Sequence, residues 1–350
     1  MQDSVSPPAP RRARLYWPFA LLAFLALGWS AFWFYAASRT ESTLGAWIER
    51  EASHGRVWTC PQRQTGGYPF RIEVTCATPT FAGPAGKARV EGSLGALKAY
   101  AQAWAPNHIL ADLDGPLKIT RDDGAAVEMT WSRLRLSLRG KPKVLERLSL
   151  QGADGVIAAG MAGEKLFGMR AGAFEAHVRQ APQREDDAYD LALALRKAAI
   201  PAFDAILGLP EPADVDFAGT SSHLAFAEKG DVAERLEVWR AAGGRLDPAS
   251  LDIRKGETRL KLNGGLGLDA AHRPEGKLQL EGDGLAPLAR RFGLNLDMVA
   301  AGNLLDGLLG GKPRKDDAPK KAELRLPLTL ANGRVAIGPL RLPVALPPLY

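Results

Sequence analysis

The sequence predicts a mainly β (α+β) protein with a large curved antiparallel sheet or half-barrel, a few packed helices and one N-terminal transmembrane helix. Three observations predict this fold. Residues 15–37 carry no charge. Many later segments alternate apolar and polar residues, which is the period of a half-buried strand. Glycine (37 residues) and proline (25 residues) are frequent, which is typical of a turn-rich chain.

The composition excludes several classes of protein. With 46% hydrophobic residues and a net charge of +6 over 350 residues, the chain is too apolar to be disordered. Two cysteines and five histidines are too few for an iron–sulfur protein or an array of zinc fingers. Three arginines and one aspartate precede residue 38, so 42 basic and 38 acidic residues follow it. This weak charge gives no reason to expect a nucleic-acid partner.

The uncharged run 15–37 is long enough to cross a bilayer as a helix. Aromatic residues lie near both of its ends, where interfacial belts are usually found. Because the arginines precede it, the positive-inside rule predicts that residues 1–14 form a basic cytoplasmic tail and that the chain after this signal-anchor is exported. We therefore expect a single-pass inner-membrane protein whose bulk lies in the periplasm.

A cleavable signal peptide is the alternative, since the small residues 36–38 permit cleavage after Ser38. The apolar region of a signal peptide is usually about 7 to 15 residues long, which is shorter than this run and favours the uncleaved anchor. Beyond it, apolar residues follow helical spacing as far as Gly55, so residues 38–55 are predicted to form a helical stalk.

Cys60 and Cys76 both lie in the exported part, with 15 residues between them. In an oxidising periplasm such a pair is expected to form a disulfide. Closing so short a loop contributes about 3 kcal/mol on the chain-entropy model. A metal or redox pair would require C-x-x-C spacing or a nearby histidine, and neither is present.

Residues 56–350 are predicted to form the periplasmic β-rich domain, beginning with strands at 57–60 and 70–76. A helix is predicted over 94–104, where Ser93 can cap the first turn and Pro106 stops the last. Further segments alternate with a period of two, each with one apolar face, and predict the strands 131–139, 145–150, 156–158, 173–178, 189–195, 215–226, 259–268 and 276–280.

Two later helices are predicted, over 232–242 and over 285–309, the first ended by a Gly-Gly pair and the second broken near Gly293. Residues 312–321 form a charged loop that we expect to be solvated and mobile. The chain closes with strands at 324–330 and 335–340, and the Asn-Gly pair between them predicts a hairpin turn.

No motif for catalysis, a metal or a cofactor is present. The five histidines are scattered singly, and the chain contains neither a G-x-S-x-G elbow nor a Walker loop. Residues 265–270 match G-x-G-x-x-A, but a turn with Pro274 follows instead of the helix that a dinucleotide site requires. We therefore expect no catalytic residues, no cofactor, no metal site and a protein that is not an enzyme.

Two groups of charged residues have alternative interpretations. Asp112 and Asp114 could be paired acids, but alternate residues of a strand share a face, which favours its solvated side. A basic ladder could likewise be a solvated face or a positive rim that contacts anionic lipid headgroups. Its residues are Arg133, Arg135 and Arg139, with Arg259 and Lys261 on another strand.

Several short segments, taken in order, resemble the bacterial envelope family catalogued as domain of unknown function 2125. These segments are 67–71, 104–108, 113–116, 239–246, 338–340 and 347–349. The resemblance implies one N-terminal span, an uncharacterised β-rich exterior and a distant similarity to AsmA-like envelope proteins. Those proteins are associated with outer-membrane homeostasis and, in longer forms, with lipid movement along a β-groove. No catalytic residues are implied.

One-sided strands with few helices to cover them favour a non-enzymatic function: the apolar face binds a lipid or another hydrophobic envelope component. The alternative is a structural or assembly factor that pairs with another envelope protein through its sheet edges.

Overall fold

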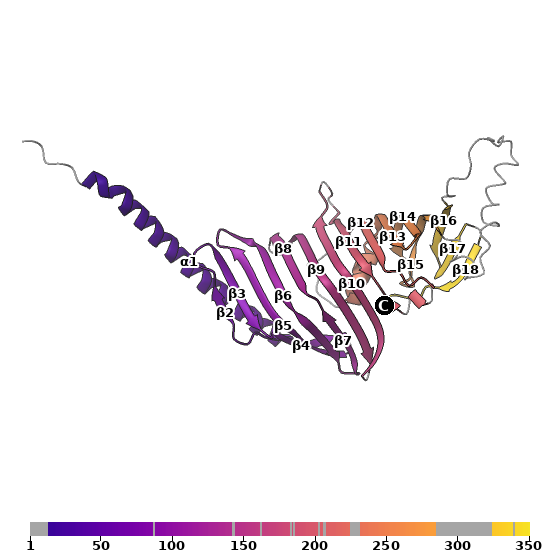
Figure 1. The fold of residues 1–350 in the computed structure, drawn as a ribbon, viewed down its shortest axis with the longest axis horizontal. Coiled ribbons are helices and arrows are strands. Elements are labelled where there is room, and N and C mark those ends of the chain that lie inside the picture. Colours follow the sequence, from indigo (N-terminus) through magenta and orange to yellow (C-terminus); the bar gives the residue numbers. More distant parts are fainter. Residues whose placement is uncertain are drawn as a thin grey trace, which may run out of the picture.

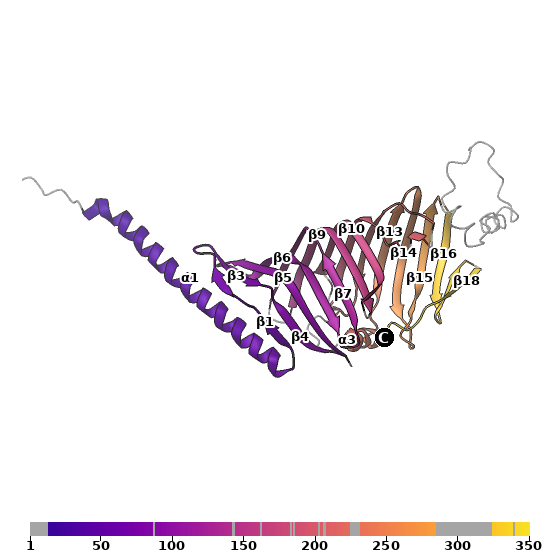
Figure 2. The same ribbon diagram turned by 60° about the horizontal axis from the view of Figure 1, so that its bottom comes forward.

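The computed structural model describes residues 13–86, 88–141, 144–161, 163–182, 184, 186–201, 204–205, 208–224, 232–284, 324–338 and 340–350. The predicted helix 285–309 and charged loop 312–321 lie outside these residues. Within them the chain forms a long helix followed by one large antiparallel sheet (Figures 1 and 2).

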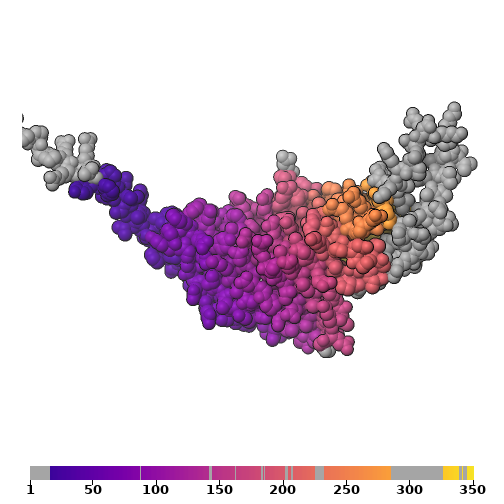
Figure 3. Space-filling model, viewed as in Figure 1, coloured from indigo at the N-terminus to yellow at the C-terminus, as the bar shows by residue number. Residues whose placement is uncertain are grey.

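Helix α1 (Ala13–Ser53) runs without a break through the predicted transmembrane helix and through the predicted stalk as far as Ser53. The part of this helix from Tyr16 onward is long enough and apolar enough to cross a membrane. The helix ends where Gly55 adopts a φ of +77°, a conformation that glycine enters without steric cost. The first turns of α1 project beyond the body of the molecule (Figure 3), so their apolar side chains are exposed.

The sheet has eighteen strands along the described chain, and every strand pair among them is antiparallel. Their bounds are β1 Val57–Thr59, β2 Gln64–Gly66, β3 Arg71–Ala77, β4 Thr80–Ala85, β5 Ala88–Gln102, β6 Ala105–Arg121, β7 Ala125–Thr130, β8 Arg133–Lys141, β9 Val144–Met161, β10 Glu164–Gln180, β11 Tyr189–Ala198, β12 Ala213–Ser221, β13 Leu246–Lys255, β14 Thr258–Leu268, β15 Pro274–Asp283, β16 Leu324–Ala331, β17 Arg334–Ile337 and β18 Leu340–Ala345.

Sequence neighbours pair throughout the second half of the sheet, from β8 to β18. In the first half, long strands pair with two shorter ones end to end: β5 with β3 and β4, and both β6 and β9 with β7 and β8. This pairing makes a single continuous layer that starts beside α1 and twists away from it (Figure 1).

The predicted helix over 94–104 is wrong, because these residues belong to β5 and its turn into β6. The ladder between β5 and β6 shifts register between Leu94 and Ala96. Leu94 and Leu97 therefore line the same cavity although they are three residues apart. The shift gives the strand the apolar spacing of a helix, which misled the period-based prediction.

Most other elements are confirmed. The segments 145–150 and 156–158 belong to one strand, β9. Helix α3 (Val232–Ala241) ends as predicted, with Gly243 at a φ of +75°. Asn332 and Gly333 both have positive φ, as a two-residue hairpin between β16 and β17 requires. Strands β2, β4, β7, β13 and β18 and the full length of β6 were not predicted, because they are short or interrupted by glycine and proline.

Candidate functional site

One face of the sheet carries a continuous apolar surface. Residues directly opposite each other in an antiparallel ladder lie on the same face, so cross-strand pairs trace rows across the sheet. Three such rows run from β3 to β16, and we call them together the apolar track. The first row is Ile72, Ala101, Ile109, Leu138, Leu148, Val178, Leu191, Gly219, Ala249, Gly264, Leu278 and Leu328. The second is Val74, Ala99, Ala111, Leu136, Leu150, Ala176, Leu193, Phe217, Leu251, Leu262, Leu280 and Leu326. The third is Cys76, Leu97, Leu113, Leu134, Gly152, Phe174, Leu195, Val215, Ile253, Leu260, Gly282 and Leu324.

No polar or charged side chain interrupts the apolar track over these twelve strands. The opposite face is polar, because the residues between the rows alternate to it. One of its rows places Lys98 opposite Asp112, and Asp112 opposite Arg135. The sheet is therefore two-sided, with hydrocarbon on one face and charge on the other.

The apolar track is only partly covered by the protein. Most of its aliphatic side chains are half-buried, and Ile109 and Leu193 are 39% and 38% exposed. No large side chain among the described residues is fully buried. A second layer of secondary structure normally covers such a face, whereas these side chains stay partly exposed among the described residues.

At the end formed by β3, β5 and β6, the apolar track is covered by α1. A cavity of about 800 Å³ lies between the helix and the sheet. Its lining is mainly apolar, from the helix side Leu44, Trp47 and Ile48 and from the sheet side Val74, Leu97 and Leu113. The helical spacing that predicted a stalk is thus the face of α1 that packs over the sheet.

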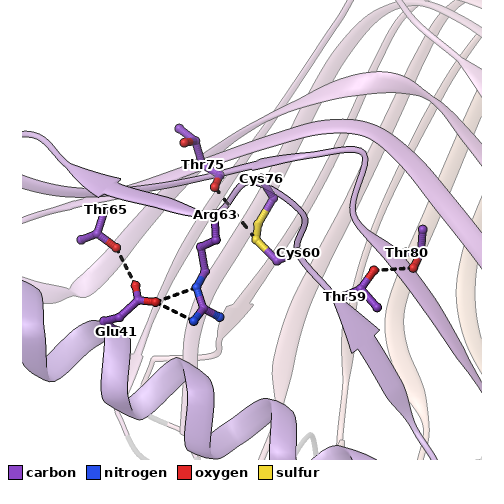
Figure 4. The surroundings of a disulfide bond; sticks show 8 residues. All are labelled: Glu41, Thr59, Cys60, Arg63, Thr65, Thr75, Cys76 and Thr80. Atoms are coloured by element: carbon purple, nitrogen blue, oxygen red, sulfur yellow. Dashed lines mark hydrogen bonds and ion pairs between the residues drawn. A yellow bond between two sulfur atoms is a disulfide. The ribbon is translucent and has the colours of Figure 1, made fainter.

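A polar contact fixes this helix against the sheet (Figure 4). Glu41 of α1 accepts hydrogen bonds from Arg63 Nε at 2.8 Å and from the Thr65 hydroxyl at 2.7 Å. The hydrogen bond from Thr65 lowers the pKa of the Glu41 carboxyl below its ordinary value; partial burial opposes this and Arg63 lowers the pKa further. The ionised form of Glu41 is therefore the one that holds the first turns of the sheet to the helix.

The predicted disulfide is present beside this contact. Cys60 follows β1 and Cys76 lies in β3, with 5.2 Å between their Cα atoms. Strand β1 pairs with β4 and not with β3 in the described ladders, so the disulfide links two parts of the sheet that share no direct ladder. Cys76 also belongs to the third row of the apolar track, at the wall of the cavity.

The structure distributes the other candidate residues over the polar face. Arg135 pairs with Asp112 at 2.9 Å, which confirms the solvated interpretation of that aspartate. Arg139 pairs with Glu146 at 3.4 Å. Arg133, Arg135 and Arg139 alternate with the track residues of β8 and so lie on the opposite face, and their contact with anionic headgroups stays a prediction.

Among the described residues, no three or more histidine, cysteine, aspartate or glutamate side chains lie close enough together to hold a metal ion. The residues that match G-x-G-x-x-A lie in β14 and the turn after it, so no helix starts there to receive a pyrophosphate.

Sequence reasoning missed the order of the strands and therefore the track itself. Each strand showed one apolar face, but only the pairing shows that these faces align.

The sequence profile of a family described as uncharacterized proteins conserved in bacteria, DUF2125, matches residues 33–345. The chain belongs to this family. No curated protein and no solved structure matches it. The family match begins inside α1 and extends to β18, so the cavity and the whole apolar track lie within the part that defines DUF2125.

We expect replacement of both cysteines by serine to lower the free energy of unfolding by about 3 kcal/mol, because the disulfide closes a short loop. Urea denaturation of the protein in detergent measures this loss. Treating the native protein with a reductant is the matched control and should give a similar decrease. An unchanged unfolding midpoint in the double variant would show that the disulfide is not a structural clamp.

The contact of Glu41 predicts a dependence of stability on pH. A carboxyl group with a lowered pKa stabilises the fold fully above the ordinary value of about 4.3, and this contribution disappears as the pH falls through its folded-state pKa. Glu41→Gln should therefore be less stable than the native protein at neutral pH, and the difference should shrink in acid. Denaturation at a series of pH values tests this, and a difference independent of pH would contradict it.

Proposed function

We propose that this DUF2125 protein is a non-enzymatic, membrane-anchored envelope protein that binds a lipid or another hydrophobic envelope component along the apolar track. The observation that carries the proposal is the alignment of three uninterrupted apolar rows across twelve strands. An exposed apolar surface of this extent on a soluble domain marks an interaction site.

The dimensions of the track suit acyl chains. Twelve strands are separated by eleven spacings of about 4.8 Å, so the track is about 50 Å long. The hydrocarbon core of a bilayer is about 30 Å thick and holds two leaflets, so one acyl chain extends about 15 Å. Each methylene group moved from water to such a face contributes about 0.8 kcal/mol, and the track can accept several chains in succession.

Two features support the proposed location, α1 and the disulfide. A single apolar helix with arginines before it anchors the protein in the inner membrane and exports the sheet, and an oxidising periplasm keeps Cys60 and Cys76 paired. The membrane itself is then one partner, and the bound amphiphile is the second. Within this proposal, Arg133, Arg135 and Arg139 contact anionic headgroups on the polar face of β8, opposite the apolar track.

A second candidate function is assembly with another envelope protein through a sheet edge. It is favoured by β18, for which the described residues supply one partner strand, β17. An unpaired strand edge offers backbone groups to an added strand. This candidate requires no occupant on the apolar track, so lipid binding distinguishes the two.

A matched pair of variants in β11 tests lipid binding. Leu193 lies on the apolar track and is 38% exposed, while its neighbour Ala192 is exposed on the opposite face. We expect Leu193→Glu to remove co-purifying lipid, because a carboxylate on the track would have to be desolvated, whereas Ala192→Glu should leave it unchanged. Native mass spectrometry and lipid extraction measure the occupancy, and circular dichroism checks that both variants fold. Wild-type protein without lipid, or a Leu193→Glu variant that keeps it, would contradict the proposal.

A further inference from the structure

Two uncharged segments that are far apart in the sequence meet on α1. One is the connection between β2 and β3, residues 67–70, and the other is the turn between β5 and β6, residues 103–104. The Ala103 amide donates a hydrogen bond to the Phe70 carbonyl at 3.1 Å, so the two segments form one unit. Gly67 has a φ of +94°, and a Cβ there would lie 2.7 Å from the Arg71 carbonyl oxygen, so this turn requires glycine.

Both segments contact the apolar part of α1. The second packs on it through Trp104, whose ring lies 6.2 Å from that of Trp29, and the first is held by hydrogen bonds. Trp29 Nε1 donates to the Pro69 carbonyl at 2.9 Å, and Trp33 Nε1 donates to the Arg71 carbonyl at 2.8 Å. Trp33 is 5% exposed beneath Tyr68, whose ring lies 5.4 Å from it.

These contacts fix the depth of the two segments relative to the span. Trp33 and Trp29 precede Ala37, the last residue of the predicted span 15–37, by four and eight positions. At a rise of about 1.5 Å per residue, their level lies about 6 to 12 Å inside the apolar run. The segments attached to them lie at the same level along the helix.

The outer sides of these segments are aromatic and uncovered. Tyr68, Phe70 and Trp104 are 54%, 63% and 57% exposed. Tyrosine and tryptophan are enriched where proteins meet the bilayer interface. The exposed surface of α1 beside them is apolar as well, so helix and turns present one hydrophobic collar around residues 29–34.

We propose that the collar formed by residues 67–70 and 103–104 is inserted into the same bilayer leaflet that α1 leaves, so that the apolar track opens directly to lipid. The proposal rests on the proposed function for its anchor and its occupant. The first row of the track begins immediately beside the collar, with Ile72, Ala101 and Ile109. An acyl chain then passes from the leaflet to the sheet without crossing water.

Depth-dependent quenching tests the insertion. Phe70→Cys and Trp104→Cys are labelled with an environment-sensitive fluorophore, since the native cysteines are joined in a disulfide and do not react. The full chain is reconstituted in vesicles of phosphatidylethanolamine and phosphatidylglycerol that contain lipids spin-labelled on the acyl chain. Ala126→Cys is the control, because it is exposed on β7, close to the turn at the opposite end of β6.

We expect the labels at 70 and 104 to be blue-shifted and to lose most of their emission, and the label at 126 to keep its emission. If both collar labels behave like the label at 126, the insertion is overturned. Lipid bound to the track is measured by native mass spectrometry on the same proteins. Retained lipid without quenching refutes the insertion alone, whereas quenching without bound lipid refutes the proposed function and leaves the insertion standing.

Discussion

Cross-strand register is the constraint on which this structure depends. Side chains alternate between the faces of a strand, so a slip of one residue in any ladder would turn a polar row onto the apolar face. From β3 to β16 the pairing places apolar residues opposite apolar residues, and Arg135 opposite Asp112. The charged face therefore helps to specify the register, since a slipped strand would bring charges onto hydrocarbon.

Glycines at two positions allow the side chains to keep their alternation between the two faces of the sheet. Gly95 lies at the shift between β5 and β6, where a Cβ would approach the Gly115 carbonyl oxygen to 2.2 Å. Gly152 lies beneath Phe174, whose ring would be 2.0 Å from an added Cβ. Gly152 thus leaves space for the ring of Phe174 opposite it, and the apolar row continues across these two strands.

The sequence predicted the features that depend on local signals. An uncharged run, an Asn-Gly turn and a pair of closely spaced cysteines each have a physical reason within a short segment, and α1, the β16–β17 turn and the disulfide agree with them. The apolar track depends on which strand pairs with which, and this is a long-range property. The pairing of Arg135 with Asp112 and the roof of α1 over Val74 were likewise outside the reach of spacing and composition.

The chemistry of the apolar track limits what it can recognise. Because its rows contain no hydrogen-bond donor or charge, binding there depends on hydrocarbon area and shape, which discriminate weakly between acyl chains. If the proposed function holds, discrimination between amphiphiles arises where headgroups meet polar side chains, at the edges of the sheet and at the cavity beside α1. A surface with this division, continuous hydrocarbon bordered by charge, suits a family of related amphiphiles better than one small molecule held in a closed pocket.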